Sequence, residues 1–174
     1  KGKYLGIVGL GNIGKRLGRL ARALNMNVIG YDVIPIDDEF AKEVGLMKAD
    51  LDTLLSSADY VSFHVPLLDS TRHMINAEKL KLMKKTARII NTARGGVIDE
   101  EDLYNSLKDG DLAGAALDVF ESEGPGLIKD KTLMELVQLD SVLITPHIGG
   151  HTEEAQSDVW TTVVARLLEE LNDM

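Results

Sequence analysis

The chain has 174 residues, a hydrophobic share of 44% and a formal net charge of −9, which suits one globular domain with a substantial core. Because it contains no cysteine, disulfides, thiolate nucleophiles and cysteine-ligated metal sites are excluded. The acidic composition disfavours nucleic acid as a partner, and no apolar run reaches the ~18 residues of a membrane span. We therefore expect a soluble, cytoplasmic protein that binds neither nucleic acid nor membrane.

Short β-branched runs alternate with helical patterns along the whole chain. This alternation predicts right-handed crossovers and a parallel sheet covered on both faces, which is an α/β doubly wound fold. We treat residues 1–174 as one domain and expect residues 121–131 to form a surface loop. Asn76 is a candidate N-cap and Gly110 a candidate helix stop. In chain order the pattern predicts a strand at 4–10, a helix over 13–24, a strand at 27–32, a helix at 49–58, a strand at 60–65, a helix at 76–83, a strand at 87–93, a helix at 99–110, strands at 112–120 and 142–146, and a last helix with an apolar face from 160 to 171.

The first predicted strand runs into a G-x-G-x-x-G motif at Gly9, Gly11 and Gly14, and a helix follows. In that context the motif predicts a dinucleotide site. The first glycine permits a tight turn, the second lets the backbone approach a pyrophosphate, and the third lets the helix pack close to the sheet. The helix N-terminus then offers unpaired N–H groups to the phosphates. An ordinary glycine-rich turn is the alternative.

Asp32 ends the second predicted strand, close to the ~20-residue spacing of a ribose-binding acid. Its carboxylate can accept hydrogen bonds from the adenosine ribose hydroxyls and would repel the negative charge of a 2′-phosphate. The sequence therefore predicts NAD rather than NADP as the cofactor. An S-adenosylmethionine-binding fold, which shares a glycine loop and an acid, and a simple helix-capping role for Asp32 remain open at this point.

Tyr104 and Lys108 form the Y-x-x-x-K pattern of short-chain dehydrogenases. They lie, however, in a charged amphipathic helix whose apolar face carries Leu103 and Leu107. We therefore interpret them as an exposed i,i+4 pair rather than as a catalytic pair.

Arg94 follows the strand at 87–93, where an open parallel sheet binds its ligands. A guanidinium group can grip a carboxylate with two hydrogen bonds and polarise a carbonyl. A surface salt bridge is the alternative role. Arg94 is therefore a candidate for binding the substrate.

His147, in the stretch ITPHIGG, follows the last predicted strand and so lies at the same edge of the sheet. Imidazole exchanges protons near neutral pH, which makes His147 a candidate acid/base; the alternative is a turn residue that caps the final helix. Asp118 ends the preceding strand, where it could face a nicotinamide amide. Glu123 is a candidate partner of His147, although Glu121 competes for that role and either acid could be a solvated loop residue.

The remaining histidines carry less information. We interpret His64 as part of the wall of an adenine pocket, and His73 and His151 as surface or cap positions. Since no two histidines have a convincing metal-ligand spacing, we predict no metal site.

Together these motifs resemble the D-2-hydroxyacid dehydrogenases, most closely the cofactor domain of D-3-phosphoglycerate dehydrogenase-type members. The resemblance runs in family order across nearly the whole chain. The matching stretches are LGIVGLGNIG, YD at 31–32, HVPL and ST within 64–71, NTARGGVIDEEDL, AALDVFESE and LITPHIGG.

The resemblance implies reversible hydride transfer between NAD and a small 2-hydroxy or 2-keto acid, on a Rossmann-type sheet. By family, Arg94 orients the substrate carboxylate and keto oxygen, His147 is the acid/base, Glu123 holds His147, and Asp118 contacts the nicotinamide carboxamide. It also implies a homodimer. Other residues that line the cofactor by this resemblance are Asn12, Ile13, Val65, Pro66, Thr92, Ala93 and Gly150, with Arg94 and His147 also beside it.

Three features depart from the family pattern. Asn12 stands where the family often has arginine, so contact with the pyrophosphate is left to the backbone. Gly124 separates Glu123 from Pro125, where the family usually has proline directly after the glutamate. The chain also begins with Lys1 at the first cofactor-domain strand, so we expect an excised cofactor domain that lacks a substrate domain and turns over slowly or not at all.

Other functions for this fold remain as alternatives. The first is a non-catalytic NAD-sensing module of the C-terminal binding protein corepressor type, which shares the fold and the three candidate residues. Formate dehydrogenase and adenosylhomocysteine hydrolase are related NAD enzymes. Glu123 argues against the former, where glutamine is usual, and the set Arg94, Glu123 and His147 argues against the latter.

Overall fold

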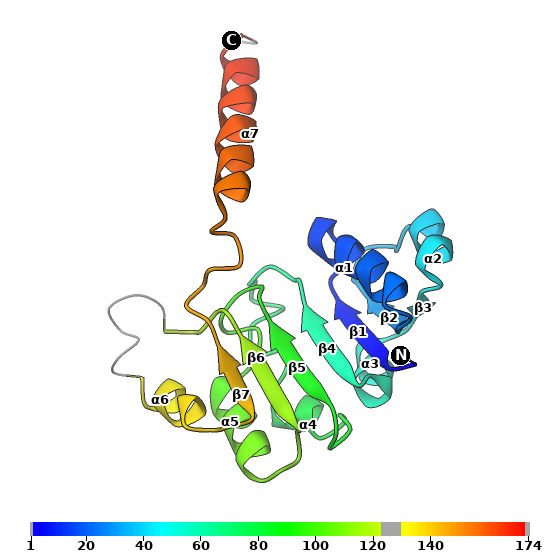
Figure 1. Ribbon diagram of the computed structural model, residues 1–174, viewed down its shortest axis with the longest axis vertical. Coiled ribbons are helices and arrows are strands. Elements are labelled where there is room, and N and C mark those ends of the chain that lie inside the picture. The colour runs from blue at the N-terminus through cyan, green and yellow to red at the C-terminus, as the bar shows by residue number, and fades with distance from the viewer. Residues whose placement is uncertain (1, 123–129, 173–174) are drawn as a thin grey trace.

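The computed structural model, which describes residues 2–122 and 130–172, contains one parallel sheet (Figure 1). Its strands are β1 (Tyr4–Val8), β2 (Asn27–Tyr31), β3 (Met47–Lys48), β4 (Tyr60–Phe63), β5 (Arg88–Asn91), β6 (Gly114–Leu117) and β7 (Val142–Ile144). They lie in the order β3-β2-β1-β4-β5-β6-β7, and every pairing is parallel. The chain winds outward from β1 and then returns to β4, so the winding reverses between these two strands. This confirms the Rossmann-type doubly wound sheet, and it places the ligand-binding crevice beside β1 and β4.

The helices are α1 (Asn12–Ala23), α2 (Asp38–Val44), α3 (Leu51–Ser57), α4 (Ala77–Leu80), α5 (Glu100–Lys108), α6 (Lys131–Val137) and α7 (Glu153–Asn172). α1 and α2 share one apolar core with β1 and β2, in which Phe40 is fully buried. α3, α4, α5 and α6 contribute leucines to a second, larger core. Helices therefore cover both faces of the sheet, as the sequence predicts.

The predicted helix boundaries have visible physical causes. The Asn76 side chain accepts a hydrogen bond from the Lys79 N–H at 3.2 Å, which confirms its role as the N-cap of α4. Gly110 lies just beyond α5 with a φ of +73°, the left-handed conformation that stops a helix. Both signals are local, and both are legible in the sequence.

Three elements were not predicted: α2, β3 and α6. β3 has two residues and lies at the sheet edge, so it shows no alternating pattern. α2 and α6 each have seven residues, but Asp37 and Asp130 cap their first turns through side-chain hydrogen bonds. These N-cap aspartates are present in the sequence and mark the start of both helices.

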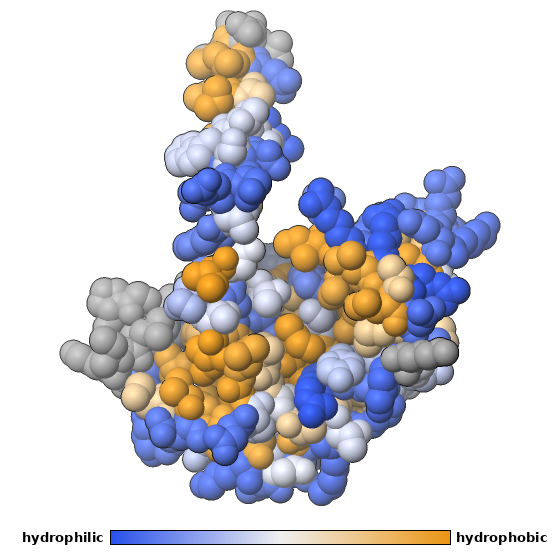
Figure 2. Space-filling view, viewed as in Figure 1, coloured by the Kyte–Doolittle hydropathy of each residue, from blue (hydrophilic) through white to orange (hydrophobic). Residues whose placement is uncertain are grey.

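The last helix, α7, extends away from the sheet (Figure 1). Its apolar residues are exposed to solvent: Val159, Trp160, Val163, Val164, Leu167, Leu168 and Leu171. Figure 2 shows an orange, apolar area toward the upper end of this helix. Among the described residues, no helix is both long enough and apolar enough to cross a bilayer.

Candidate functional site

The glycine loop between β1 and α1 is built so that only glycine fits at two positions. Gly9 has a φ of +93°, and a Cβ there would lie 2.8 Å from the His64 carbonyl group. A Cβ on Gly14 would lie 2.1 Å from the Gly9 carbonyl oxygen. These contacts agree with the predicted tight turn and with the predicted close packing of helix on sheet.

Gly11 is different, because a Cβ on it would meet no atom within 4 Å. It precedes α1 as the N-cap residue, provides no side-chain cap, and the first turn of the helix has no acidic residue. The first N–H groups of α1 therefore have no side-chain cap, and no acidic residue in the first turn offsets the positive end of the helix dipole. This arrangement fits an anion such as a pyrophosphate. Asn12 and Ile13 lie exposed at this end of the helix.

Asp32 lies directly after β2 and ties the glycine loop to that strand. Its Oδ2 accepts a hydrogen bond from the Leu10 N–H at 2.6 Å, and its Oδ1 accepts one from the Ile34 N–H at 3.0 Å. Each carboxylate oxygen has a second lone pair with which it can accept a ribose hydroxyl. The acid is therefore held in place while it keeps the capacity to bind sugar.

A pocket of about 370 Å³ opens beside this loop, where the winding of the sheet reverses. Most of its lining side chains are apolar, as expected for a site that takes a flat heterocycle. Burial lowers the pKa of His64 below its ordinary value, and its Nε2 lies 3.0 Å from the Ser62 Oγ. The lining residues are Gly9, Gly11, Tyr31, Asp32, Val33, Ile34, His64, Val65, Pro66, Leu68, Ser70, Thr71 and Met74.

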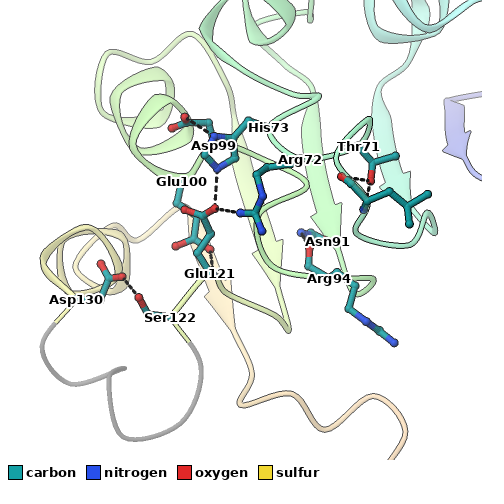
Figure 3. Close-up of polar contacts among 11 residues, drawn as sticks. Thr71, Arg72, His73, Asn91, Arg94, Asp99, Glu100, Glu121, Ser122 and Asp130 are labelled. Carbon is teal, nitrogen blue, oxygen red and sulfur yellow. Dashed lines mark hydrogen bonds and ion pairs between the residues drawn. The ribbon is translucent and has the colours of Figure 1, made fainter.

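The loop that carries Arg94 follows β5 and is fixed by the last residue of that strand. Asn91 donates from its amide nitrogen to the Arg94 carbonyl at 3.0 Å and accepts from the Ala93 N–H at 3.1 Å. Thr92 and the Arg94 side chain are exposed, and Figure 3 shows the guanidinium directed away from the neighbouring cluster of charged residues. The backbone is thus held, and the Arg94 guanidinium donates to the Ala93 carbonyl through Nη1 at 2.5 Å while its other N–H donors remain for a ligand.

The loop that carries His147 follows β7 and is held by the end of β6. Asp118, which is buried, accepts hydrogen bonds from the Thr145 hydroxyl at 2.5 Å, the Ile148 N–H at 3.0 Å and the Gly149 N–H at 2.9 Å. Burial alone would raise the pKa of Asp118, but these hydrogen bonds and the charge of the nearby His147 outweigh it and lower that pKa. Asp118 therefore holds the loop that carries His147, a role that the sequence did not predict.

His147 itself is exposed and has a φ of +54°, in the left-handed region that costs energy for a side chain other than glycine or asparagine. His147 therefore lies in a bend at the exposed carboxyl edge of the sheet. Gly150 follows in the same exposed turn.

Of the two candidate partners of His147, Glu121 is already engaged elsewhere. Its Oε1 lies 2.6 Å from the His73 Nε2 and 3.3 Å from the Arg72 Nη1 (Figure 3). Glu123 lies outside the described residues. The contacts of Glu121 support Glu123 as the predicted partner, which stays a prediction.

His73 lies at the surface, as predicted, with 38% of its side chain exposed. Its ring also lies between two carboxylates, Glu121 and Asp99, with Nδ1 3.3 Å from the Asp99 Oδ2, and the sequence did not predict these contacts. These partners are distant in the sequence, so no local pattern could have indicated them. His151 is exposed, as predicted.

Tyr104 and Lys108 form a local pair on α5, with the Lys108 Nζ 5.4 Å from the centre of the tyrosine ring. Neither residue lines the pocket beside the glycine loop. The prediction that they are not a catalytic pair agrees with this placement. In the part of the chain that the structure describes, no group of three histidine, aspartate or glutamate residues could hold a metal ion.

Residues 1–149 match the family model described as the D-isomer specific 2-hydroxyacid dehydrogenase, NAD binding domain. The chain belongs to this family. It is an NAD-binding domain, and the family comprises NAD-dependent 2-hydroxyacid oxidoreductases. The resemblance stated from the motifs is therefore confirmed.

Individual relatives agree. The chain is 47% identical over 167 residues to a D-3-phosphoglycerate dehydrogenase from Methanocaldococcus jannaschii, covering 95% of this chain and 30% of the relative. It is 45% identical over 170 residues to a hydroxypyruvate reductase from Thermotoga maritima, and the match covers 98% of this chain and 53% of the relative. The chain also matches a solved structure, that of the D-isomer specific 2-hydroxyacid dehydrogenase from Lactobacillus delbrueckii ssp. bulgaricus in complex with NAD. The TM-score is 0.90 at 35% identity, and the match covers 98% of this chain and 54% of the solved one. The chain thus spans from under a third to about half the length of these proteins.

Proposed function

We propose that this domain serves an NAD-dependent oxidoreductase that interconverts a small 2-hydroxy acid and the matching 2-keto acid. One observation carries the proposal. The carboxyl edge of a single parallel sheet presents the glycine loop and Asp32 together with the loops that bear Arg94 and His147. Cofactor binding, carboxylate binding and proton transfer can therefore take place side by side.

In this proposal the named residues bind the cofactor, orient the substrate or transfer a proton. The nicotinamide cofactor, when bound, would supply the hydride as NADH during reduction of the keto acid and would accept it as NAD+ during oxidation of the hydroxy acid. Asp32 binds the adenosine ribose and the N-terminus of α1 binds the pyrophosphate. Arg94 holds the substrate carboxylate and polarises the keto oxygen, and His147 donates a proton from its imidazole to that oxygen during reduction. Glu123 is the proposed partner that holds His147.

The acid/base role is tested by His147→Asn, because asparagine tolerates the left-handed backbone at this position. We expect kcat for keto-acid reduction to fall by about 100- to 10 000-fold, with NADH binding retained. The variant is made in a protein that joins this domain to a substrate domain, and His151→Asn is the matched control. Retention of kcat in His147→Asn would disprove the assignment.

The substrate is proposed only by class. The two named relatives act on D-3-phosphoglycerate and hydroxypyruvate, so both acids belong in the first panel, assayed with this domain alone and with a substrate domain attached. We expect slow or no turnover by the domain alone, because closure of a second domain excludes water. Tight NADH binding without turnover of any 2-keto acid in the joined protein would instead favour a nicotinamide-sensing module.

We further propose a cytoplasmic homodimer. Support comes from apolar side chains that have no cover in the described residues: the stripe on α7, and the exposed Leu143 beside the half-buried Ala116 and Ile90, its neighbours in register on β6 and β5. Figure 2 shows the corresponding apolar area over this part of the sheet. Sedimentation equilibrium tests the proposal, and a monomer at all concentrations would contradict it.

A further inference from the structure

A cluster of charged side chains lies beside the proposed active site without a role in it (Figure 3). Glu121, four residues beyond the end of β6, contacts His73 at 2.6 Å and Arg72 at 3.3 Å through the same oxygen, Oε1. The other ring nitrogen of His73 lies 3.3 Å from Asp99, at the start of α5. The cluster thus joins residues from the segments that follow β4, β5 and β6.

Hydrogen bonds also tie the backbone of these residues to the neighbouring segments. The Glu121 N–H donates to the Glu100 Oε1 at 2.7 Å, and Glu100 is buried. The His73 N–H donates to the Gly96 carbonyl at 2.7 Å, and His73 has a φ of +48°. Burial raises the pKa of Glu100 to about 7, with the nearby carboxylates of Glu121, Asp130 and Asp99 adding to the rise.

The two glycines that follow Arg94 lie against this cluster and against the backbone of Phe120. A Cβ on Gly95 would lie 1.9 Å from the Phe120 carbonyl oxygen, so the two backbones touch. Gly96 has a φ of +75°, and a Cβ there would lie 2.9 Å from the Glu121 Oε1 and 3.3 Å from the Arg72 Nη1. The two glycines therefore let the Arg94 loop seat against Phe120 and Glu121.

We propose that Glu121 is a positioning residue: through Arg72 and His73 it locks the loop after β5 against the end of β6 and so fixes where Arg94 presents its guanidinium. The consequence for substrate binding rests on the proposed function. A displacement of about 1 Å at a group that orients substrate is enough to cost up to ~100-fold in rate. Glu121 acts through Arg94 and does not itself touch the substrate.

The first test uses this chain and does not depend on catalysis. Glu121→Gln keeps the size of the side chain and removes its charge, and Glu101→Gln, on the exposed side of α5, is the matched control. We expect amide hydrogen exchange at His73 and Glu121 to quicken about tenfold or more in Glu121→Gln only, since the hydrogen bonds there open more often. Unchanged exchange in Glu121→Gln would overturn the proposal.

A second variant, His73→Asn, covers the case in which Glu121→Gln fails to fold, because asparagine tolerates the positive φ at position 73. It removes the contact from the other side and is expected to quicken exchange at the same amides. Normal exchange there in a folded His73→Asn would likewise overturn the proposal.

The third test measures the catalytic consequence in a protein with a substrate domain attached. We expect Glu121→Gln to raise KM for the keto acid about tenfold, with a smaller change in kcat and an unchanged Kd for NADH. In the double variant Glu121→Gln, His73→Asn, KM for the keto acid should be no higher than in the more impaired of the two single variants, since both substitutions break the same network. Additive losses, or a KM that does not move, would overturn the positioning role. A wild-type protein with no turnover contradicts the proposed function alone, because hydrogen exchange still decides whether Glu121 locks the loop.

Discussion

At the scale of single residues, two glycines of the same loop differ in whether the fold itself requires glycine. Gly14 is required by the fold, since its position leaves no room for a methyl group beside the Gly9 carbonyl, whereas Gly11 faces open space. The open space at Gly11 agrees with the close approach of a pyrophosphate that the motif predicts. The two glycines should therefore respond differently to the same substitution.

We expect Gly14→Ala to destabilise the domain by about 1–3 kcal/mol through overpacking, as measured by urea unfolding. Gly11→Ala is the matched control: its φ of −71° suits alanine, so stability should change by less than about 0.5 kcal/mol while NADH binds more weakly. Equal stability of the two variants would contradict this account of the loop.

Glu100 gives a pH-dependent prediction. Its pKa is raised from 4.5 to about 7 in the folded state. Between these two pH values the folded chain therefore keeps a proton on Glu100 that the unfolded chain has released. The contribution of that proton to stability is complete below pH ~4.5 and is lost as pH rises through ~7. Between pH 5 and 8 the wild type should lose about 1–3 kcal/mol relative to Glu100→Gln. Parallel stability curves for the two proteins, measured by urea unfolding with Glu101→Gln as control, would rule this out.

At the scale of elements, Asp118 couples β6 to the turn after β7. Asp118→Asn replaces one acceptor oxygen by an amide nitrogen, so one of the N–H groups of Ile148 and Gly149 loses its partner. We expect a loss of about 1–3 kcal/mol in stability and faster hydrogen exchange at both amides. Thr145→Val, which removes only the hydroxyl donor, should leave those amides protected. If both stay protected in Asp118→Asn, the carboxylate does not hold the turn.

The same scale shows how far the sequence predicts this molecule. The longer strands and helices follow from periodicity and caps, and Arg94, Asp118 and His147 follow because parallel strands bring their carboxyl ends to one edge. The predicted strands are mostly too long, for example 4–10 against Tyr4–Val8, since the last residues leave the sheet to build the binding loops. The contact of Glu121 with His73 spans 48 positions, and no local pattern encodes a pair that only the packing of two crossovers creates.

At the scale of the whole molecule, the doubly wound sheet is an NAD-binding domain. The apolar stripe of α7 and the exposed Leu143 have no cover among the described residues, and the chain spans about half of the hydroxypyruvate reductase that it resembles. The cofactor preference, in contrast, belongs to this domain alone, because Asp32 and the glycine loop both lie within it.

We expect this domain to select NAD through Asp32 and the glycine loop, and calorimetric titration of the chain with NADH and with NADPH measures that selectivity. NADH should bind saturably and NADPH much more weakly, because the Asp32 carboxylate repels the 2′-phosphate of NADPH. NADPH that binds as tightly as NADH, or no binding of either nucleotide, would contradict it.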